Sequence, residues 1–537
     1  MYRNINIQRM GKIFKGVILI FIMGISGISS GQNGYLNPVI PGFYPDPSVC
    51  RVGEDFYLVN SSFEYFPGVP VFHSRDLIHW EQIGYCLTRD SQLPLQKCHS
   101  SGGIYAPTIR YQEGLFYMIT TNTTGGGNFM VTATNPAGPW SEPIHVEPAG
   151  IDPDLFFEKG RAYVCSTDGQ MGIQMSEIDI KTGKRIGEKR HIWRGTGGRN
   201  AEGPHIYKNA GLYYLMISEG GTEYGHKVTI ARSKELMGPY MSNPANPILT
   251  HADESGQGSP IQGTGHADLV KASDGSWWMV CLGFRPTKGF HHILGRETFL
   301  APVRWDENSW PVVNGTGTIA LEMKTKTLPQ VTGSKSPGRA EFDDSGLGLE
   351  WNYLRNPVRE NYSFSDKKGF LSLKATEVGL EVADSPSFIG RRQQHFNFEA
   401  GTELEFNPSK ENEEAGLVVY MNNSHHYKLS VKRAGGKKIL SLSNRLGGFY
   451  FSSGNIVSLK PGPVRLKVVG SREFYTCFYA QGNDKFKELG KCDTRFLSSE
   501  TAGGFTGVYL GLFATGNGQS TNSKAFFDWF EYHQGNE

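Results

Sequence analysis

The chain has 537 residues, which corresponds to two to four domains at about 100–200 residues per domain. Its 54 Lys and Arg nearly balance its 52 Asp and Glu, and this argues against a nucleic-acid-binding protein, which normally concentrates basic charge. A hydrophobic content of 38% is too high for a disordered chain and too low for a polytopic membrane protein. The 67 glycines and 12% aromatic residues indicate many short strands joined by tight turns.

Residues 1–31 are predicted to be a secretory signal peptide. Basic residues precede an apolar run from Val17 to Ile28, and the small residues at 29–31 follow it. This run is shorter than the ~20 residues that a membrane-spanning helix needs. We therefore expect an exported protein, either periplasmic or secreted. Seven cysteines at scattered spacing predict no disulfide framework and at least one free thiol, and the sequence does not determine any pairing.

Five copies of a short pattern follow: a turn with Gly, Asp or Asn, then an aromatic-rich apolar strand. Each copy predicts a hairpin, because Gly and Asp suit turn positions with positive φ. The copies are about 45 to 65 residues apart, which is the length of one four-stranded propeller blade. They predict a five-bladed β-propeller over residues 32–328. The five copies lie at residues 53–57, 113–117, 159–163, 209–214 and 273–278.

The second half of the chain predicts a separate β domain. Residues 329–340 are rich in Gly, Ser, Pro and Lys, which is typical of a linker. Apolar and polar residues then alternate through 341–537, for example at 416–420 and 427–431, and no helical period of any length occurs. A β-sandwich is the expected fold of this region. The chain as a whole is therefore predicted to be all-β.

Three carboxylates share one local layout. Asp46, Asp152 and Glu202 each lie just before an expected strand and are followed by Pro or Gly-Pro, which restrains the neighbouring backbone. Such dipeptides are common in ordinary turns, but three of them on three blades can converge on one cavity near the propeller axis. Hydrolysis of a glycosidic bond requires two carboxyl groups across a pocket, one protonated and one ionised.

These segments resemble the signature motifs of glycoside hydrolase family 43, and the resemblance covers essentially the whole chain after residue 31. It implies a five-bladed propeller followed by a concanavalin-like sandwich, and an exo-acting, inverting glycosidase. Asp46 would then be the general base, Glu202 the general acid, and Asp152 the residue that orients this acid and tunes its pKa. Arg296 would bind sugar hydroxyls. The motifs lie at residues 43–48, 151–156, 202–205, 265–268 and 294–298.

The resemblance also implies further contacts. Phe63 and Tyr105 would line the pocket, and Tyr509 would reach from the sandwich to close it, although it also suits an ordinary core position. His266 resembles a residue that lies beside calcium or another cation in the propeller channel of some members, while the reaction itself requires no cofactor. Asp154 is the near competitor of Asp152, which is preferred because family members often lack an acid at the later position.

The expected substrate is a neutral oligosaccharide or polysaccharide, with no nucleic-acid partner and no membrane association after signal removal. Xylosidase members of the family often have Trp where Tyr105 stands. The sequence therefore favours release of terminal, non-reducing α-L-arabinofuranosyl residues from hemicellulose side chains (arabinoxylan or xyloglucan). A β-D-xylosidase acting on xylo-oligosaccharides is the alternative, and a non-catalytic carbohydrate-binding propeller is the alternative of another class. The parent polysaccharide, linkage and oligomeric state remain open.

Overall fold

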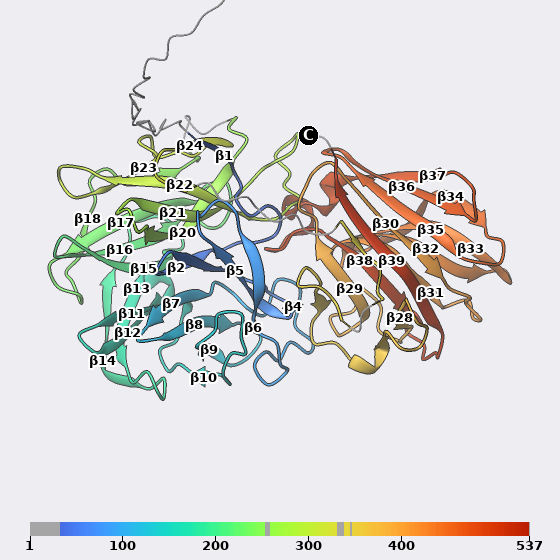
Figure 1. Ribbon diagram of the computed structural model, residues 1–537, viewed down its shortest axis with the longest axis horizontal. Helices are drawn as coiled ribbons and strands as arrows, with labels where there is room; N and C mark the ends of the chain where they lie inside the picture. Colours follow the sequence, from blue (N-terminus) through green and yellow to red (C-terminus); the bar gives the residue numbers. More distant parts are fainter. Residues whose placement is uncertain (1–32, 253–257, 330–337, 344–345, 536–537) are drawn as a thin grey trace, which may run out of the picture.

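The computed structural model describes residues 33–252, 258–329, 338–343 and 346–535, and it consists of two β domains side by side (Figure 1). The predicted signal peptide lies outside the described residues. Within them, no helix is long and apolar enough to cross a membrane. The all-β prediction is confirmed, because the longest helical segments among these residues, η3 (Thr494–Leu497) and α1 (Ser499–Ala502), have four residues each.

The first domain contains the five predicted blades. Each is an antiparallel sheet in which four consecutive strands run outward in chain order, except that the short β4 is skipped in the first. A further strand, β19 (Leu249–Thr250), pairs with β17. The blades are β2 (Ser48–Val52), β3 (Asp55–Val59), β5 (Gly68–Ser74) and β6 (Glu81–Leu87); β7 (Thr108–Gln112), β8 (Leu115–Asn122), β9 (Gly127–Ala133) and β10 (Ile144–His145); β11 (Ile151–Glu158), β12 (Arg161–Thr167), β13 (Ile173–Ile178) and β14 (Arg185–Trp193); β15 (Glu202–Asn209), β16 (Leu212–Glu219), β17 (Lys227–Ser233) and β18 (Met241–Ser242); and β20 (Gln262–Lys271), β21 (Trp277–Phe284), β22 (Glu297–Trp305) and β23 (Pro311–Val313).

The predicted hairpins join the first and second strands of every blade. Their turn glycines all have positive φ, between 64° and 87°, the backbone conformation that glycine adopts without steric penalty. A Cβ atom at any of them would meet nothing within 4 Å, so backbone conformation rather than space selects glycine. These glycines are Gly53, Gly114, Gly160, Gly211 and Gly275.

A short pairing closes the propeller. Strand β1 (Asn33–Leu36) pairs antiparallel with β24 (Glu322–Thr325), which joins the chain before the first blade to the chain after the last. The Asn37 side chain adds two bonds to the last blade: its amide N–H donates to the Leu300 carbonyl (3.0 Å), and its oxygen accepts the Leu300 N–H (2.9 Å). The ring is therefore fixed by chain segments almost 300 residues apart.

The second domain is a sandwich of two antiparallel sheets, as predicted. Alternation along β35 places Val464, Leu466 and Val468 in the core, where they meet Leu417 and Leu512 of the other sheet. The first sheet contains β27 (Tyr362–Ser363), β28 (Leu371–Lys374), β39 (Lys524–Gln534), β30 (Phe398–Glu405), β35 (Val464–Gly470), β36 (Phe474–Gln481) and β37 (Lys487–Asp493), with β25 (Arg339–Ala340) also paired to β39. The second contains β29 (Ser387–Arg392), β38 (Tyr509–Thr515), β31 (Glu414–Asn422), β32 (His425–Ala434), β33 (Lys437–Leu446) and β34 (Phe449–Ser458). Short 3₁₀ turns lie at η1 (Gly169–Met171) and η2 (Arg359–Asn361). Strand β25 falls inside the segment predicted as linker, so the sandwich begins slightly earlier than expected.

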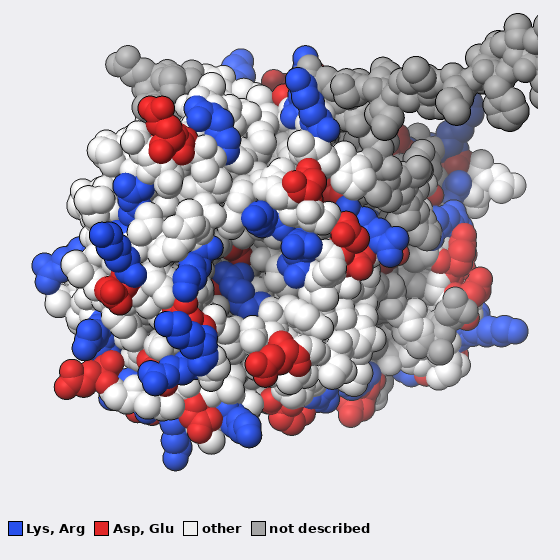
Figure 2. All heavy atoms as spheres, turned by 60° about the vertical axis from the view of Figure 1, so that its left-hand side comes forward, with Lys and Arg blue, Asp and Glu red and all other residues white. Residues whose placement is uncertain are grey.

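The two domains share a buried interface. Strand β4 (Tyr65–Phe66) of the propeller pairs with β26 (Tyr353–Leu354) of the sandwich side. The Arg392 guanidinium, 2% exposed, donates to the Phe43 carbonyl of the propeller (2.7 Å). On the propeller side of the molecule, acidic and basic side chains are interspersed (Figure 2).

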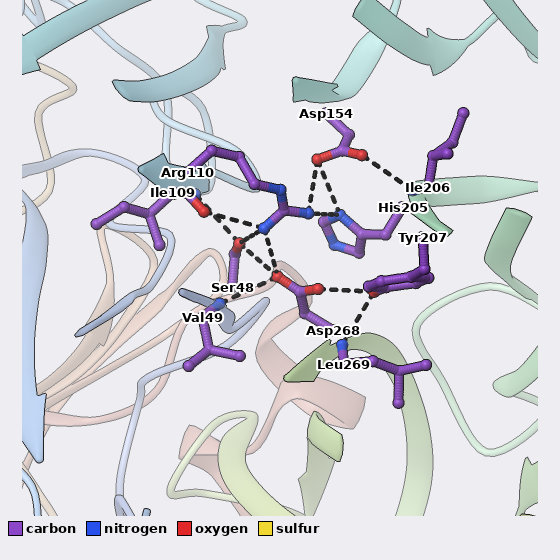
Figure 3. A network of polar contacts seen from close by, with 10 residues as sticks. All are labelled: Ser48, Val49, Ile109, Arg110, Asp154, His205, Ile206, Tyr207, Asp268 and Leu269. Atoms are coloured by element: carbon purple, nitrogen blue, oxygen red, sulfur yellow. Dashed lines mark hydrogen bonds and ion pairs between the residues drawn. The ribbon is translucent and has the colours of Figure 1, made fainter. Parts of the chain in front are cut away.

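A buried polar network ties the inner strands of all five blades together (Figure 3). Arg110 of β7 lies between two carboxylates, Asp154 of β11 (2.7 Å) and Asp268 of β20 (2.9 Å). Ser48 of β2 donates to Asp268 (2.7 Å), and His205 of β15 lies 3.0 Å from the guanidinium of Arg110. Both carboxylates are fully buried, and Arg110 supplies the opposite charge that buried ionic groups require.

We expect Arg110→Met to lower the free energy of unfolding by about 3–5 kcal/mol, because removal of one partner leaves uncompensated buried charge. Urea unfolding measures the change. Arg51→Met is the matched control: Arg51 lies on the inner strand of the first blade but is exposed, and its loss should change stability by less than about 1 kcal/mol. Equal stability of the two variants would contradict the role given to the network.

Candidate active site

A cavity of about 140 Å³ lies where the inner strands begin, facing the sandwich. At ~30 Å³ per water molecule it holds the volume of about five waters, which is the scale of one sugar ring. Seven of the eight predicted site residues line it. The lining consists of Asp46, Phe63, Tyr105, Ala106, Ile151, Asp152, Glu202, Thr222, His226, His266, Arg296 and Phe505.

Irregular backbone turns the functional side chains toward this cavity. Asp46, Asp152 and His266 have φ of 53°, 55° and 41°, a left-handed conformation that is rare outside glycine. The register of the inner strands also shifts between Ile151 and Asp154 and between Glu202 and His205. Bulges re-aim side chains beside functional sites, and strained residues persist only when the surrounding structure holds them. The strand starts are therefore shaped for the cavity rather than for regular pairing.

Asp46 is held as a carboxylate. Burial alone would raise its pKa, but Arg296 at 2.8 Å, His266 and the hydroxyl of Ser61 together lower it below the ordinary value. Its two oxygens are divided between the Arg296 guanidinium and the Ser61 hydroxyl. At neutral pH Asp46 is therefore ionised and oriented, which suits a general base.

Glu202 is in the opposite state. Burial and, to a smaller extent, the nearby negative charge of Asp46 raise its pKa to about 7, against the weaker opposing effect of Arg296. Asp152 is also buried, and Glu202 and Asp46 raise its pKa well above the ordinary value. Because Asp152 and Glu202 are like charges at close quarters, neutral pH leaves a proton on this pair. The cavity thus holds an ionised and a protonated carboxyl group at the same time.

The structure separates Asp152 from its competitor Asp154. Asp152 lines the cavity, whereas Asp154 lies below it in the axial network, paired with Arg110 and accepting the N–H of Ile206 (3.0 Å). These two aspartates therefore have different roles, although they lie two positions apart on the same inner strand: Asp152 faces the cavity and Asp154 holds the blades together.

The prediction that Tyr509 reaches from the sandwich to close the pocket is wrong. This tyrosine is fully buried, stacks on Tyr65 at 4.0 Å between ring centroids, and does not line the cavity. The ring that reaches the cavity from the sandwich is Phe505, four residues earlier in the chain. Its ring centroid lies 6.0 Å from that of Phe63 and 6.1 Å from that of Tyr105, two rings that were predicted to line the pocket. The three rings together form an aromatic wall of the cavity.

Thr222 and His226, which follow β16, also line the cavity and were not predicted from the sequence. The Thr222 hydroxyl accepts a bond from Arg296 (2.9 Å). Nδ1 of His226 lies 3.2 Å from the Gly263 carbonyl, so it carries the proton, while Nε2 is buried without a hydrogen-bond partner. Burial lowers the pKa of His226 to about 3, and the neutral ring leaves Nε2 as an acceptor for a ligand hydroxyl. The glycine-rich stretch before it was the available signal.

His266 lines the cavity, with Nδ1 3.9 Å from Asp46. Its neighbours fit a calcium site poorly, because calcium takes six to eight oxygen ligands, whereas the carboxylates of Asp46 and Asp268 are accompanied here by His205, His226 and the cationic Arg296. Among the described residues, no cluster of three His, Cys, Asp or Glu side chains could hold a metal ion. The cation at His266 stays a prediction, and no chemical step is assigned to it.

A second, larger cavity of about 440 Å³ adjoins the first at the interface between the domains. Thr222, Arg296 and Phe505 line both cavities, so the two adjoin at these side chains. The outer cavity also contains Tyr224 of the propeller and Glu500 of the sandwich, whose side chains are hydrogen-bonded at 3.1 Å. A ligand longer than one sugar ring can extend from the inner cavity into this space.

Comparisons with known proteins agree with this geometry. Residues 35–311 match the model of glycosyl hydrolases family 43, and residues 339–533 match the β-xylosidase C-terminal concanavalin A-like domain. The chain is 44% identical, over 96% of its length and 98% of the relative, to the non-reducing end α-L-arabinofuranosidase BoGH43B of Bacteroides ovatus. It is 41% identical, over 92% of its length and 98% of the relative, to a xylosidase/arabinosidase of Butyrivibrio fibrisolvens. The solved structure of Bacteroides ovatus xyloglucan PUL GH43B superposes with a TM-score of 0.91 at 44% identity, covering 94% of this chain and 100% of that one.

Proposed function

Because the chain belongs to glycoside hydrolase family 43, we propose that this hydrolase releases terminal α-L-arabinofuranosyl residues from the non-reducing ends of hemicellulose side chains, with inversion of configuration. One observation carries the proposal: Asp46, whose pKa is lowered, and Glu202, whose pKa is raised to about 7, share a cavity the size of one sugar ring. A non-catalytic sugar-binding propeller has no need for this division of protonation states.

The chemistry follows from the two carboxyl groups. A water oxygen attacks the anomeric carbon while Asp46 takes the water proton, and the bond from that carbon to the leaving oxygen breaks as Glu202 donates its proton to this oxygen. Arg296 keeps Asp46 ionised and oriented until the water is activated. The products are the free sugar and the shortened oligosaccharide or polysaccharide.

The choice of sugar rests on two lines of support. Tyr105 stands where xylosidase members of the family often have Trp, and the Bacteroides ovatus relative is named an arabinofuranosidase. The Butyrivibrio relative carries both names, which supports β-D-xylosidase activity on xylo-oligosaccharides as the second candidate. In either case the outer cavity receives the leaving group, because it adjoins the sugar cavity at Phe505.

Export to the periplasm or the medium is also part of this proposal. It is supported by the basic, apolar and small-residue order of residues 1–31. The described cysteines are all buried and unpaired, so the fold does not depend on an oxidising compartment. N-terminal sequencing of the exported protein would check the proposal: cleavage near residue 31 supports it, and an intact Met1 contradicts it.

We expect Asp46→Asn and Glu202→Gln each to lower kcat by about 10²–10⁴, the usual contribution of a positioned acid or base. The two variants should differ on a 2,4-dinitrophenyl glycoside, whose leaving group needs no proton. On this substrate Glu202→Gln should regain most of its activity and Asp46→Asn should not.

Glu54→Gln, an exposed carboxylate of the first hairpin, is the control and should behave as the unmodified enzyme. Thermal unfolding of each variant shows whether the fold is retained. Near-normal turnover by either folded active-site variant would refute the assignment of roles.

The pH profile should report the same two groups. Since Glu202 must be protonated, kcat/KM should fall as pH rises through about 7, and since the pKa of Asp46 is lowered, the acidic fall should lie below its ordinary 3.8. Asp152→Asn removes a like charge beside Glu202 and should move the alkaline fall to lower pH. An alkaline limb that does not move would contradict a role of Asp152 in tuning the acid.

The sugar and the stereochemistry can be measured together by ¹H NMR during hydrolysis of 4-nitrophenyl α-L-arabinofuranoside and 4-nitrophenyl β-D-xyloside. We expect the arabinofuranoside to have the higher kcat/KM and the first-formed sugar to have the inverted anomeric configuration. A higher value for the xyloside would favour the second candidate. A first-formed sugar of retained configuration would exclude the inverting mechanism.

A further inference from the structure

Glu64 is a fully buried carboxyl group that the proposed chemistry leaves unused. It follows the cavity residue Phe63, and its main-chain carbonyl accepts the N–H of Arg355 from the sandwich side (2.8 Å). The Arg355 guanidinium donates instead to the carbonyls of Cys98 and Asp384. Burial therefore dominates the surroundings of the Glu64 carboxyl and raises its pKa to about 7. The group lies at the junction of the two domains.

The Glu64 carboxyl holds a residue in an unfavourable conformation. Its Oε2 accepts the backbone N–H of Ser101 (3.0 Å), while Oε1 is buried without a hydrogen-bond partner. Ser101 has φ of 62°, in the left-handed region that is unfavourable for a non-glycine residue. The bond from Ser101 to Glu64 opposes this strain.

Ser101 in turn holds the ring that the sandwich contributes to the cavity. Its hydroxyl oxygen accepts the backbone N–H of Phe505 (2.9 Å). The preceding residue, Gly504, has φ of 84°, and a Cβ atom there would lie 2.4 Å from the Ser101 hydroxyl. Glycine is therefore required for this approach. The Phe505 carbonyl accepts from Arg296 (3.5 Å), so propeller groups bind this residue on both sides of its Cα.

We propose that Glu64 and Ser101 are positioning residues that set the Phe505 ring as the wall between the sugar cavity and the outer cavity. The inference rests on the proposed function, because its effect is read as substrate binding. The position of the Phe505 ring is defined by its surroundings: it lines both cavities, and the Arg296 guanidinium lies 5.6 Å from the ring centroid. Displacement of Phe505 would merge the two spaces and loosen the fit around the substrate.

A role in stability alone accounts poorly for these groups. A buried carboxyl group with an unpartnered oxygen costs free energy, and an apolar side chain of similar volume would serve the interface better. The strained Ser101 adds to that cost. Both features are explained if the serine hydroxyl must lie where it meets the Phe505 N–H.

A double-mutant cycle between Ser101 and Phe505 tests the proposal, with kcat and KM measured on the 4-nitrophenyl pentoside that the unmodified enzyme prefers. Loss of one hydrogen bond in Ser101→Ala should raise KM up to about tenfold and change kcat less than about twofold. Phe505→Ala should raise KM at least as much. The double variant should match Phe505→Ala, because a serine that acts through this ring has no further effect once the ring is absent.

Two further variants separate positioning from folding. Ser100→Ala is the matched control: the Ser100 hydroxyl donates to Asn423 of the sandwich (2.8 Å), so this variant removes another bond between the domains without touching Phe505. Its KM should be unchanged. Glu64→Gln keeps an oxygen that can accept the Ser101 N–H and should retain the normal KM, whereas Glu64→Ala should behave as Ser101→Ala.

Thermal unfolding identifies any variant that fails to fold. Gly504→Ala, which crowds the Ser101 hydroxyl from the other side, replaces Ser101→Ala in that case and should raise KM similarly. An unchanged KM in a folded Ser101→Ala, or single effects that multiply in the double variant, would overturn the inference while the hydrolase activity stands. An unmodified enzyme inactive on both pentosides would instead overturn the proposed function, and the inference with it.

Discussion

The architecture of this enzyme depends on one arginine that lies between two buried carboxylates. Arg110 lies between the carboxylates of Asp154 and Asp268, and the network around it includes side chains from the inner strands of all five blades (Figure 3). A ring of blades has no central element of its own, so the positions of its inner strands relative to one another need a common fixed point. The active-site residues lie only a few positions earlier on the same strands: Asp152 precedes Asp154, and His266 precedes Asp268. The ionic network and the catalytic cavity therefore lie at successive positions along the same converging inner strands.

Electrostatic interactions give the carboxyl groups of the cavity different pKa values and therefore different roles. The carboxyl groups of Asp46 and Asp152 are buried and that of Glu202 is partly buried, and burial by itself raises the pKa of all three. The Arg296 guanidinium contacts Asp46, which keeps that group ionised, and the resulting negative charge helps to keep the proton on Glu202. Arg296 thus keeps Asp46 ionised by direct contact, and the charge of Asp46 in turn favours the protonated form of Glu202. A neutral substrate leaves this arrangement undisturbed, which agrees with the nearly balanced charge of the chain.

Local sequence patterns predicted the features that depend on local chemistry. The five hairpins were predictable because their turns need positive φ, and the carboxylates were predictable because each lies beside a proline at a strand start. The resemblance to a family supplied Arg296 and His266, which show no local signal of comparable strength. Patterns could not locate Phe505, since its role arises from the packing of the sandwich against the propeller. Tyr509 occupies an alternating strand position in the same region, and only the interface shows that its ring is buried against Tyr65. His226 was missed for a similar reason: its free Nε2 follows from a bond that its other nitrogen makes to a distant carbonyl.

The sandwich is consequently a part of the catalytic unit rather than an appended module. Its contribution to the sugar cavity is one ring on a short segment between α1 and β38, and this segment has little secondary structure of its own to hold it. The propeller supplies the missing constraint from two directions, through the Ser101 hydroxyl and through the same Arg296 that orients Asp46. The Arg296 guanidinium thus both binds the Phe505 carbonyl and keeps the base Asp46 ionised. A shift of the sandwich relative to the propeller would therefore disturb the shape of the pocket and the electrostatics of catalysis together.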